Sequence, residues 1–199
     1  MSTASTKLTR EDLYSLEQYS ILRDDFRQKI MKHKENRRIE LGNHLLLLFE
    51  DKLIMQYQVQ EMLKAEKIFD VAGIEEELGA YNPLIPDGNN WKATMMIQYT
   101  DIEQRQHMLS QLIGIELLVW LQVDGFEKIF AIANEDLIDR DNEEKTSAVH
   151  FLRFELTPEM VSAAKNGANL SAGVDHENYS EHIQPLDNNI ADALRQDLI

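Results

Sequence analysis

Apolar and polar residues alternate from Trp91 to Tyr99, where every second side chain is apolar and most of those between are polar. A period of two is typical of a strand that buries one face. Similar patterns predict further strands at residues 117–123, 127–133, 146–156 and 168–176. Asp124-Gly125 lies between the first two of these and predicts a tight hairpin.

Helical signals dominate the first half of the chain. Capping residues or helical periodicity predict helices from Thr9 (with Asp12 as its capping partner), at residues 24–36, from about Asp51, at 74–81, from Thr100 to Gly114, from Thr157 to Gly167, and at 190–198. The second of these turns Phe26 and Ile30 inward. A short strand, a Gly42-Asn43 turn signal and an apolar strand at residues 44–49 separate it from the third.

Helices crowd the first half and strands the second, with a hairpin among them. This order favours an α+β fold, with an antiparallel or mixed sheet and helices packed mainly on one side. The chain has 199 residues and is 43% hydrophobic, enough for one sizeable core. We expect a single domain over residues 1–199, with flexible residues 1–7.

Charge and cysteine content exclude several functions. Residues 1–69 carry 12 Lys and Arg against 11 Asp and Glu, whereas the remaining residues carry 8 against 24. This acidity disfavours binding to nucleic acid and to anionic membranes. The absence of cysteine excludes disulfides, thiolate catalysis and iron–sulfur ligation by this chain. With no secretory signal and no apolar stretch long enough to span a membrane, we expect a cytoplasmic protein.

One basic stretch departs from the acidic balance. It runs from Arg27 to Arg38 and has Glu35 as its single acidic residue. Such a run is most often a solvated helix face. Its functional alternative is a surface for an anionic ligand or an acidic partner, carried by Arg27, Lys34, Arg37 and Arg38.

Two polar features suggest a small-ligand site. On the long helix, Gln58 falls within the apolar arc and Tyr57 and Glu61 lie on its border. They form either a structural hydrogen-bond network or the polar floor of a pocket. Trp91 and Lys92 follow the turn-rich segment 82–90, whose prolines, Gly88 and asparagines are explained by turn chemistry alone. The pairing of an aromatic surface with a cation also suits an anionic or aromatic ligand.

Histidines offer a weaker metal hypothesis. His176 and His182 lie among three carboxylates, yet their spacing matches no His-Glu-x-x-His or Glu-x-x-His motif. The alternative is an acidic surface loop. His150 alternates with Leu152 and Phe154, which is typical of a buried core residue as well as of a ligand.

Four segments carry a family resemblance: LTREDLYSLEQY, HKENRRIELGNHLLLLFEDKLIMQYQVQEMLKAEKIF, YNPLIPDGNNWKATMMIQY and KTSAVHFLRFELTPEMV. They resemble the bacterial domain of unknown function 3501 family, over nearly the whole chain. The family label carries no activity and assigns no catalytic residue. The resemblance implies gene neighbours that encode rubrerythrin-like di-iron proteins and cysteine-rich iron–sulfur oxidoreductases. Lacking cysteine and di-iron motifs, this chain would be an accessory of such a redox module.

Three functional hypotheses follow. The leading one is an accessory or small-ligand-binding protein that uses the basic stretch for a partner and the Tyr57, Gln58, Glu61 and Trp91 region for a ligand. The second is a metal-assisted enzyme in which His150, or His176 with His182, binds a divalent ion. The third is a structural dimer that covers an apolar helix face. The sequence assigns neither a cofactor nor an oligomeric state.

Overall fold

A computed structural model describes residues 7–133 and 145–199. Its helices are α1 (Leu16–Glu35), α2 (Lys52–Glu66), α3 (Val71–Tyr81), α4 (Ile102–Gln111), α5 (Pro158–Lys165) and α6 (Asn188–Arg195). Its strands are β1 (Arg38–Leu41), β2 (Leu45–Phe49), β3 (Asn90–Ile97), β4 (Val119–Val123), β5 (Ile129–Phe130), β6 (Ile132–Ala133), β7 (Val149–Glu155), β8 (Leu170–His176) and β9 (Tyr179–Ile183). Short 3-10 helices are η1 (Arg10–Asp12), η2 (Asn82–Leu84) and η3 (Ile115–Leu117).

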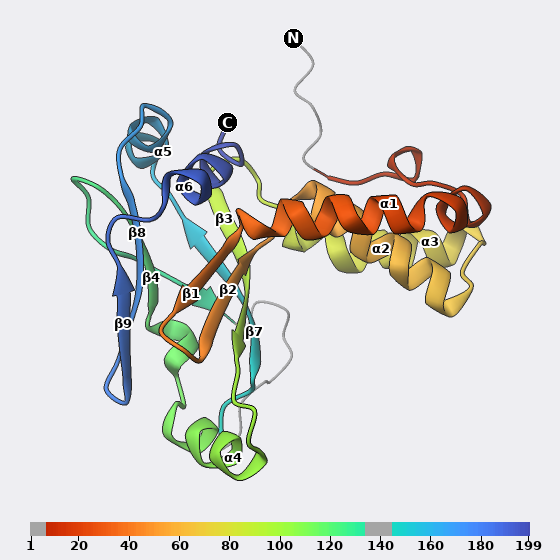
Figure 1. The fold of residues 1–199 in the computed structure, drawn as a ribbon. Coiled ribbons are helices and arrows are strands. Elements are labelled where there is room, and N and C mark those ends of the chain that lie inside the picture. The colour runs from red at the N-terminus through yellow and green to blue at the C-terminus, as the bar shows by residue number, and fades with distance from the viewer. Residues whose placement is uncertain (1–6, 134–144) are drawn as a thin grey trace.

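The strands form two antiparallel sheets that face each other (Figure 1). One has the order β1-β2-β3-β7-β6 and the other β5-β4-β8-β9. Their inner faces share one hydrophobic core, to which Met95 and Phe154 contribute from the first sheet and Leu121 and Val174 from the second. The alternation of β3 follows directly, because its odd-numbered residues face this core and Lys92 and Thr94 face outward.

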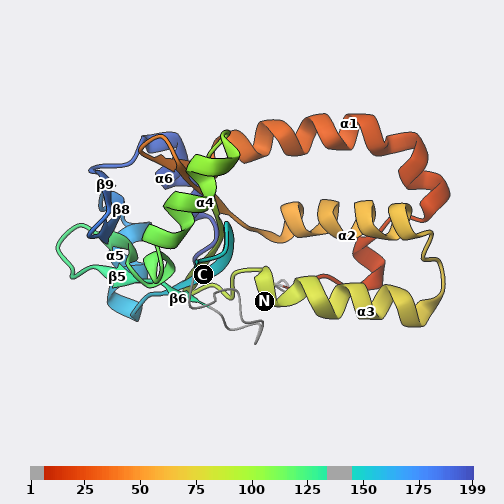
Figure 2. The same ribbon diagram turned by 90° about the horizontal axis from the view of Figure 1, so that it is seen from below.

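Helices α1, α2 and α3 form an arm that projects away from the sheets (Figure 1). Seen from below, α2 lies between α1 and α3 (Figure 2). Side-chain caps from Ser15, Asp51 and Asp70 begin the three helices. Small apolar clusters within the arm are separate from the core of the sheets. The chain leaves the arm after α1 to form β1 and β2, enters it again at α2, and returns to the sheet through η2 and β3.

The predicted α+β class is confirmed, and the structure adds a second sheet to it. Helices therefore do not cover the inner face of the first sheet, because the second sheet does. Strand β9 was expected to be an acidic loop. It is an edge strand with mostly exposed side chains, so it has no apolar face that would make its alternation visible in the sequence.

The start of the chain also differs from expectation. Thr9 does form the predicted capping box with Asp12, but the helix that follows is a single 3-10 turn. Ser15 then begins α1, which is continuous through the expected second helix. Of the expected flexible residues 1–7, residues 1–6 lie outside the described ranges. Within those ranges, no helix is both long and apolar enough to cross a membrane.

Candidate functional site

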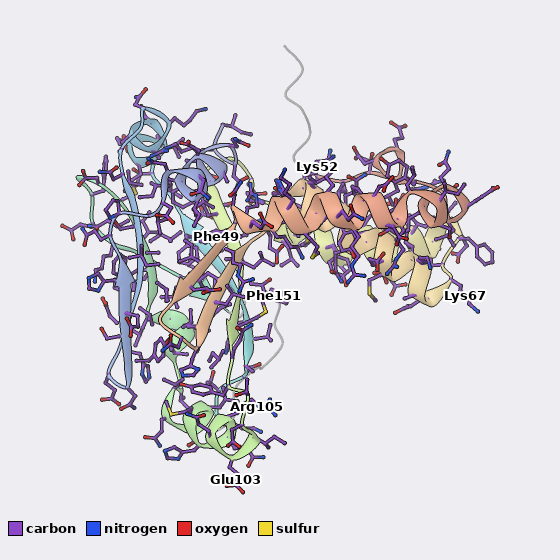
Figure 3. The ribbon with its side chains drawn as sticks, viewed as in Figure 1. Phe49, Lys52, Lys67, Glu103, Arg105 and Phe151 are labelled. Atoms are coloured by element: carbon purple, nitrogen blue, oxygen red, sulfur yellow. The ribbon has the colours of Figure 1, made fainter. Side chains whose placement is uncertain are left out.

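A cleft of about 590 Å³ lies where the chain returns from the arm to the first sheet. We call it the sheet–arm cleft. One wall comes from Lys7 and from the end of the arm: Gly79, Asn82, Pro83, Leu84 and Asp87. The other wall comes from the outer face of the sheet and includes Glu50, Lys92, Phe151, Arg153 and Glu155. Figure 3 shows Phe151 on β7, on the side from which the arm projects. The volume is typical of small-molecule sites.

Glu50 is the most unusual side chain of the cleft. It follows β2 directly, and its amide donates to the Lys92 carbonyl oxygen at 2.9 Å. Its carboxylate Oε1 accepts a hydrogen bond from Thr94 Oγ1 at 2.5 Å. The side chain is buried, with 5% of the residue exposed. Its second oxygen, Oε2, has no hydrogen-bond partner among the described residues.

Burial raises the pKa of Glu50 above its ordinary value, although the Thr94 hydrogen bond and nearby cations oppose the shift. A buried carboxyl oxygen without a partner is costly, by about 1–3 kcal/mol. Most buried polar groups are satisfied, so an exception in a concave site requires an explanation. Glu50 is part of the cleft lining, and a ligand donor would satisfy Oε2 if the side chain turned this closed-off oxygen toward the cavity.

Lys92 holds the turn segment against the sheet. Its Nζ donates to the carbonyl oxygens of Pro83 and Ile85 at 2.8 and 2.9 Å, and it pairs with Asp87 at 3.0 Å. Asn90 donates to the same Asp87 oxygen and to Glu155. Burial alone would raise the pKa of Asp87, but the hydrogen bonds from Asn90 and Lys92 lower it below its ordinary value. The ammonium therefore fixes the cleft wall and has all three of its donors engaged.

Two cations lie directly opposite each other on the outer face. Lys92 on β3 is the register partner of Arg153 on β7. Like charges in this position repel each other. Each is balanced by its own carboxylate, because Lys92 pairs with Asp87 and Arg153 with Glu155. Lys92 and Arg153 are therefore each neutralised by a carboxylate, whereas the carboxylate of Glu50 has one oxygen without a partner among the described residues.

The structure separates the predicted ligand residues. Lys92 lines the cleft, whereas Trp91 points the opposite way into the core and donates from Nε1 to the Leu194 carbonyl oxygen at 2.8 Å. Tyr57, Gln58 and Glu61 lie within the arm on α2. Together the five residues do not line one cavity among the described pockets.

Glu61 belongs to the network that joins α2 to α1. It accepts a hydrogen bond from the Tyr19 hydroxyl at 2.5 Å and pairs with Arg23 at 2.8 Å. The Arg23 hydrogen bond lowers the pKa of Glu61. Tyr57 packs edge-on against Phe26, with ring centroids 5.9 Å apart. This arrangement matches the structural alternative for these residues, a network between helices.

The buried glutamine of α2 is Gln60, where the periodicity had pointed to Gln58. Gln60 is fully buried, accepts a hydrogen bond from the Tyr14 amide at 2.6 Å and donates to the Tyr14 carbonyl oxygen at 3.3 Å. Gln58 is half-buried. The expected arcs were wrong because α2 is covered on two sides, by α1 and by α3 (Figure 2).

Arg37 is not part of an exposed basic surface. It is buried at the base of the arm, where Nε pairs with Asp51 at 2.8 Å and Nη2 with Asp197 at 2.5 Å. Arg27 and Arg38 are exposed and Lys34 is half-buried, so these three keep the accessibility that a partner surface requires. Binding of a partner by Arg27, Lys34 and Arg38 stays a prediction.

The predicted metal residues do not converge. His176 faces inward, and its Nε2 lies 3.3 Å from the Ile113 carbonyl oxygen. His182 pairs in register with Gly173, which places it on the outer face of the same sheet. His150 is buried, with Nε2 at 3.0 Å from both Thr146 Oγ1 and the Ser147 carbonyl oxygen. No group of three His, Asp or Glu residues in the described ranges is placed to hold a metal ion.

Sequence reasoning missed Glu50, Phe151 and Arg153 as cleft residues. One indication of this wall was present in the sequence. Lys92 and Thr94 lie on the outward face of β3, and a strand face that meets only solvent does not require particular side chains. The position of Glu50 between an apolar strand and a helix cap gave no comparable signal. Its burial depends on β3, which is distant in sequence.

Comparison with known proteins identifies relatives but no activity. The family model described as a protein of unknown function, DUF3501, matches residues 7–198. A crystal structure of a novel protein of unknown function from Burkholderia pseudomallei is 48% identical and has a TM-score of 0.90, covering 97% of this chain and 100% of that one. The search of curated proteins finds no match. The chain therefore belongs to the DUF3501 family, as its sequence segments indicated.

Proposed function

We propose that this chain is a small-ligand-binding accessory protein whose ligand occupies the sheet–arm cleft. The observation that carries the proposal is Glu50 Oε2, a buried carboxyl oxygen without a partner among the described residues, in a cavity of ligand size. Lys92 and its three hydrogen bonds hold the cleft wall in place before any ligand binds. Preorganisation of this kind lowers the entropic cost of binding.

Gly79 offers a position from which a side chain can be introduced at the cleft. It lines the cleft from α3, and a Cβ at this position would meet no atom within 4 Å. The Gly79→Trp variant therefore places an indole at the cleft, attached through a Cβ that meets no neighbour. The exposed Glu103→Gln on α4, far from the cleft in Figure 3, is a matched control.

Saturation-transfer NMR with a mixed fragment panel of amines, neutral molecules and acids provides the measurement. We expect at least one fragment to bind the native protein and Glu103→Gln, and to lose most of its signal with Gly79→Trp. A panel without binders would contradict the proposal. So would binding that Gly79→Trp leaves unchanged.

The accessory role extends the same proposal to a protein partner. The family resemblance supports a redox module with a rubrerythrin-like protein, and the exposed Arg27 and Arg38 with Lys34 support an acidic partner surface. Charge reversal at Arg27 and Arg38 is expected to weaken binding to a purified rubrerythrin-like protein from the same organism, because complementary charge accelerates association. Equal binding by the double variant and the native chain, in biolayer interferometry at low salt, would contradict this part.

A further inference from the structure

Hydrogen-bond accounting in the sheet–arm cleft shows which group a ligand must bring. The three donors of Lys92 are engaged by Pro83, Ile85 and Asp87. The Glu155 carboxylate accepts from Arg153 and Asn90. Glu50 Oε2 is the one buried side-chain oxygen of the described cleft lining without a partner. The unmet requirement is therefore for a donor.

The surroundings of Glu50 favour a charged donor over a neutral one. Arg37, the nearest buried cation, donates to the main-chain oxygen of Glu50 at 3.4 Å and directs its ion pairs to Asp51 and Asp197. The Glu50 carboxylate has Thr94 as a neutral donor. An ionised carboxylate in so dry a position is stabilised most by an ammonium group, because charge-assisted hydrogen bonds are the stronger ones.

The rest of the lining limits the shape and charge of the ligand. Phe151, Pro83 and Leu84 give the cleft an apolar surface against which a hydrocarbon or ring can pack. Asp87 and Glu155, the other carboxylates of the described lining, already pair with Lys92 and Arg153, so a second ammonium group would find no carboxylate there without a cation. A monocation with an apolar body fits these features better than a polyamine.

We propose that the sheet–arm cleft binds a small organic monoammonium ion, whose N–H donates to Glu50 Oε2 while its apolar body packs against Phe151 and Leu84. This assignment rests on the proposed function and names its ligand class.

Three probes of similar size and different head group separate the possibilities: phenethylamine as the ammonium, phenethyl alcohol as the neutral donor and hydrocinnamate as the anion. Each is titrated by calorimetry into the native protein, Glu50→Gln and the control Glu103→Gln, at mildly alkaline pH. We expect the amine to bind the native protein most tightly. A hydrogen bond to a charged group predicts a loss of about tenfold or more in Glu50→Gln and none in Glu103→Gln.

Acidification provides a second readout on the native protein. Protonation of Glu50 removes the charge that attracts the ammonium, so the affinity for phenethylamine falls as the pH is lowered. In Glu50→Gln the affinity does not follow this titration. The elevated pKa of Glu50, caused by burial, places the change above the ordinary range of a carboxyl group.

The outcomes distinguish the ligand class from the site. If the alcohol or the acid binds as tightly as the amine, or if Glu50→Gln binds the amine normally, the ammonium assignment is wrong. The proposed function still stands in that case, provided that Gly79→Trp blocks the probe that binds. If neither these probes nor the fragment panel binds, both fail. Should Glu50→Gln not fold, the order of the three probes on the native protein decides.

Discussion

At the scale of single residues, the cleft depends on the Glu50 carboxyl group, which the fold buries at a cost in desolvation. Glu50 accepts a hydrogen bond from Thr94 on one oxygen and is otherwise removed from water. Burial of the charged carboxylate lowers the stability of the folded protein. Buried ionisable groups of this kind are concentrated at functional sites. Because burial affects the stability of the protein without a ligand, the ionisation of Glu50 can be measured in the free protein.

The pH dependence of stability isolates Glu50. Because burial raises its pKa above the ordinary 4.5, the folded chain binds more protons than the unfolded chain between the two values. The free energy of unfolding is thus expected to fall as the pH rises through this window, by about 1.4 kcal/mol for each unit of elevation. Glu50→Gln lacks this loss and should gain stability relative to the native protein as the pH rises above the ordinary pKa of a glutamate.

Urea unfolding across that range measures the difference between Glu50→Gln and the native protein. Subtraction removes the contributions of other titrating groups, and Glu103→Gln serves as the exposed control. A difference that does not change with pH would mean that Glu50 titrates as an ordinary surface carboxyl.

Two glycines of α3 give opposite expectations. Gly79→Ala is expected to raise the free energy of unfolding by about 0.5–1 kcal/mol, because alanine suits a helix interior and its Cβ meets no neighbour. Gly73→Ala lies in the same helix, but its Cβ would come within 2.6 Å of Ile68 Cγ2, so no such gain is expected. Thermal unfolding of the two variants compares them directly, and equal shifts would contradict the difference in free space beside the two glycines.

At the scale of elements, the arm is tied together by a few buried polar groups. Gln60 on α2 both accepts from and donates to the main chain of Tyr14, just before α1 begins. Gln60→Ala leaves these main-chain groups without their partner and is expected to cost about 1–3 kcal/mol. Gln58→Ala, on the same helix, should cost less. Equal losses in chemical denaturation would contradict this assignment.

The sequence predicted the helices and strands better than it predicted which parts of the chain pack around them. The alternation of β3 was informative because one face of that strand is buried and the other is not. For α2 the period alone could not reveal a helix covered on two sides, and Gln58 was therefore chosen in place of Gln60. His176 and His182 illustrate a third limit, because the β8–β9 pairing places them on opposite faces of one sheet. Glu50 was missed since its partners, Thr94 and the Lys92 carbonyl oxygen, come from later in the chain.

At the scale of the whole molecule, Arg37 joins the arm, the first sheet and the C-terminal segment. It pairs with Asp51, the cap of α2, and with Asp197, which follows α6. Burial raises the pKa of Asp197, against the lowering effect of Arg37. The base of the arm is thus fixed by charges that are removed from solvent.

Removal of Arg37 is expected to be severe. Arg37→Met leaves the buried Asp197 carboxylate without its cation and Asp51 with His33 as its remaining ion-pair partner, at a cost of about 3–5 kcal/mol. Its neighbour Arg38 is exposed and pairs with Glu40 at the surface, so Arg38→Met should cost no more than about 1 kcal/mol. Similar midpoints for both variants in guanidinium unfolding would refute the distinction between a buried and a surface arginine.

The arm also leaves apolar side chains exposed at its far end, among them Ile21, Phe69 and Val71. Lys67, just before Phe69, marks this end in Figure 3. The structural-dimer hypothesis stays a prediction, which the mass measured by light scattering tests. A dimer that the Phe69→Ser variant converts to a monomer would support it, and a monomeric native chain would contradict it.

The central claim is that the sheet–arm cleft is a binding site for a small molecule. Amide chemical-shift mapping of the labelled native protein, titrated with phenethylamine, tests this most directly. The account predicts that the shifted amides cluster around Glu50, Gly79, Lys92 and Phe151, and that Gly79→Trp abolishes the shifts. Shifts that cluster on α4 or on the second sheet would contradict it, and so would the absence of shifts with phenethylamine and with every fragment of the panel.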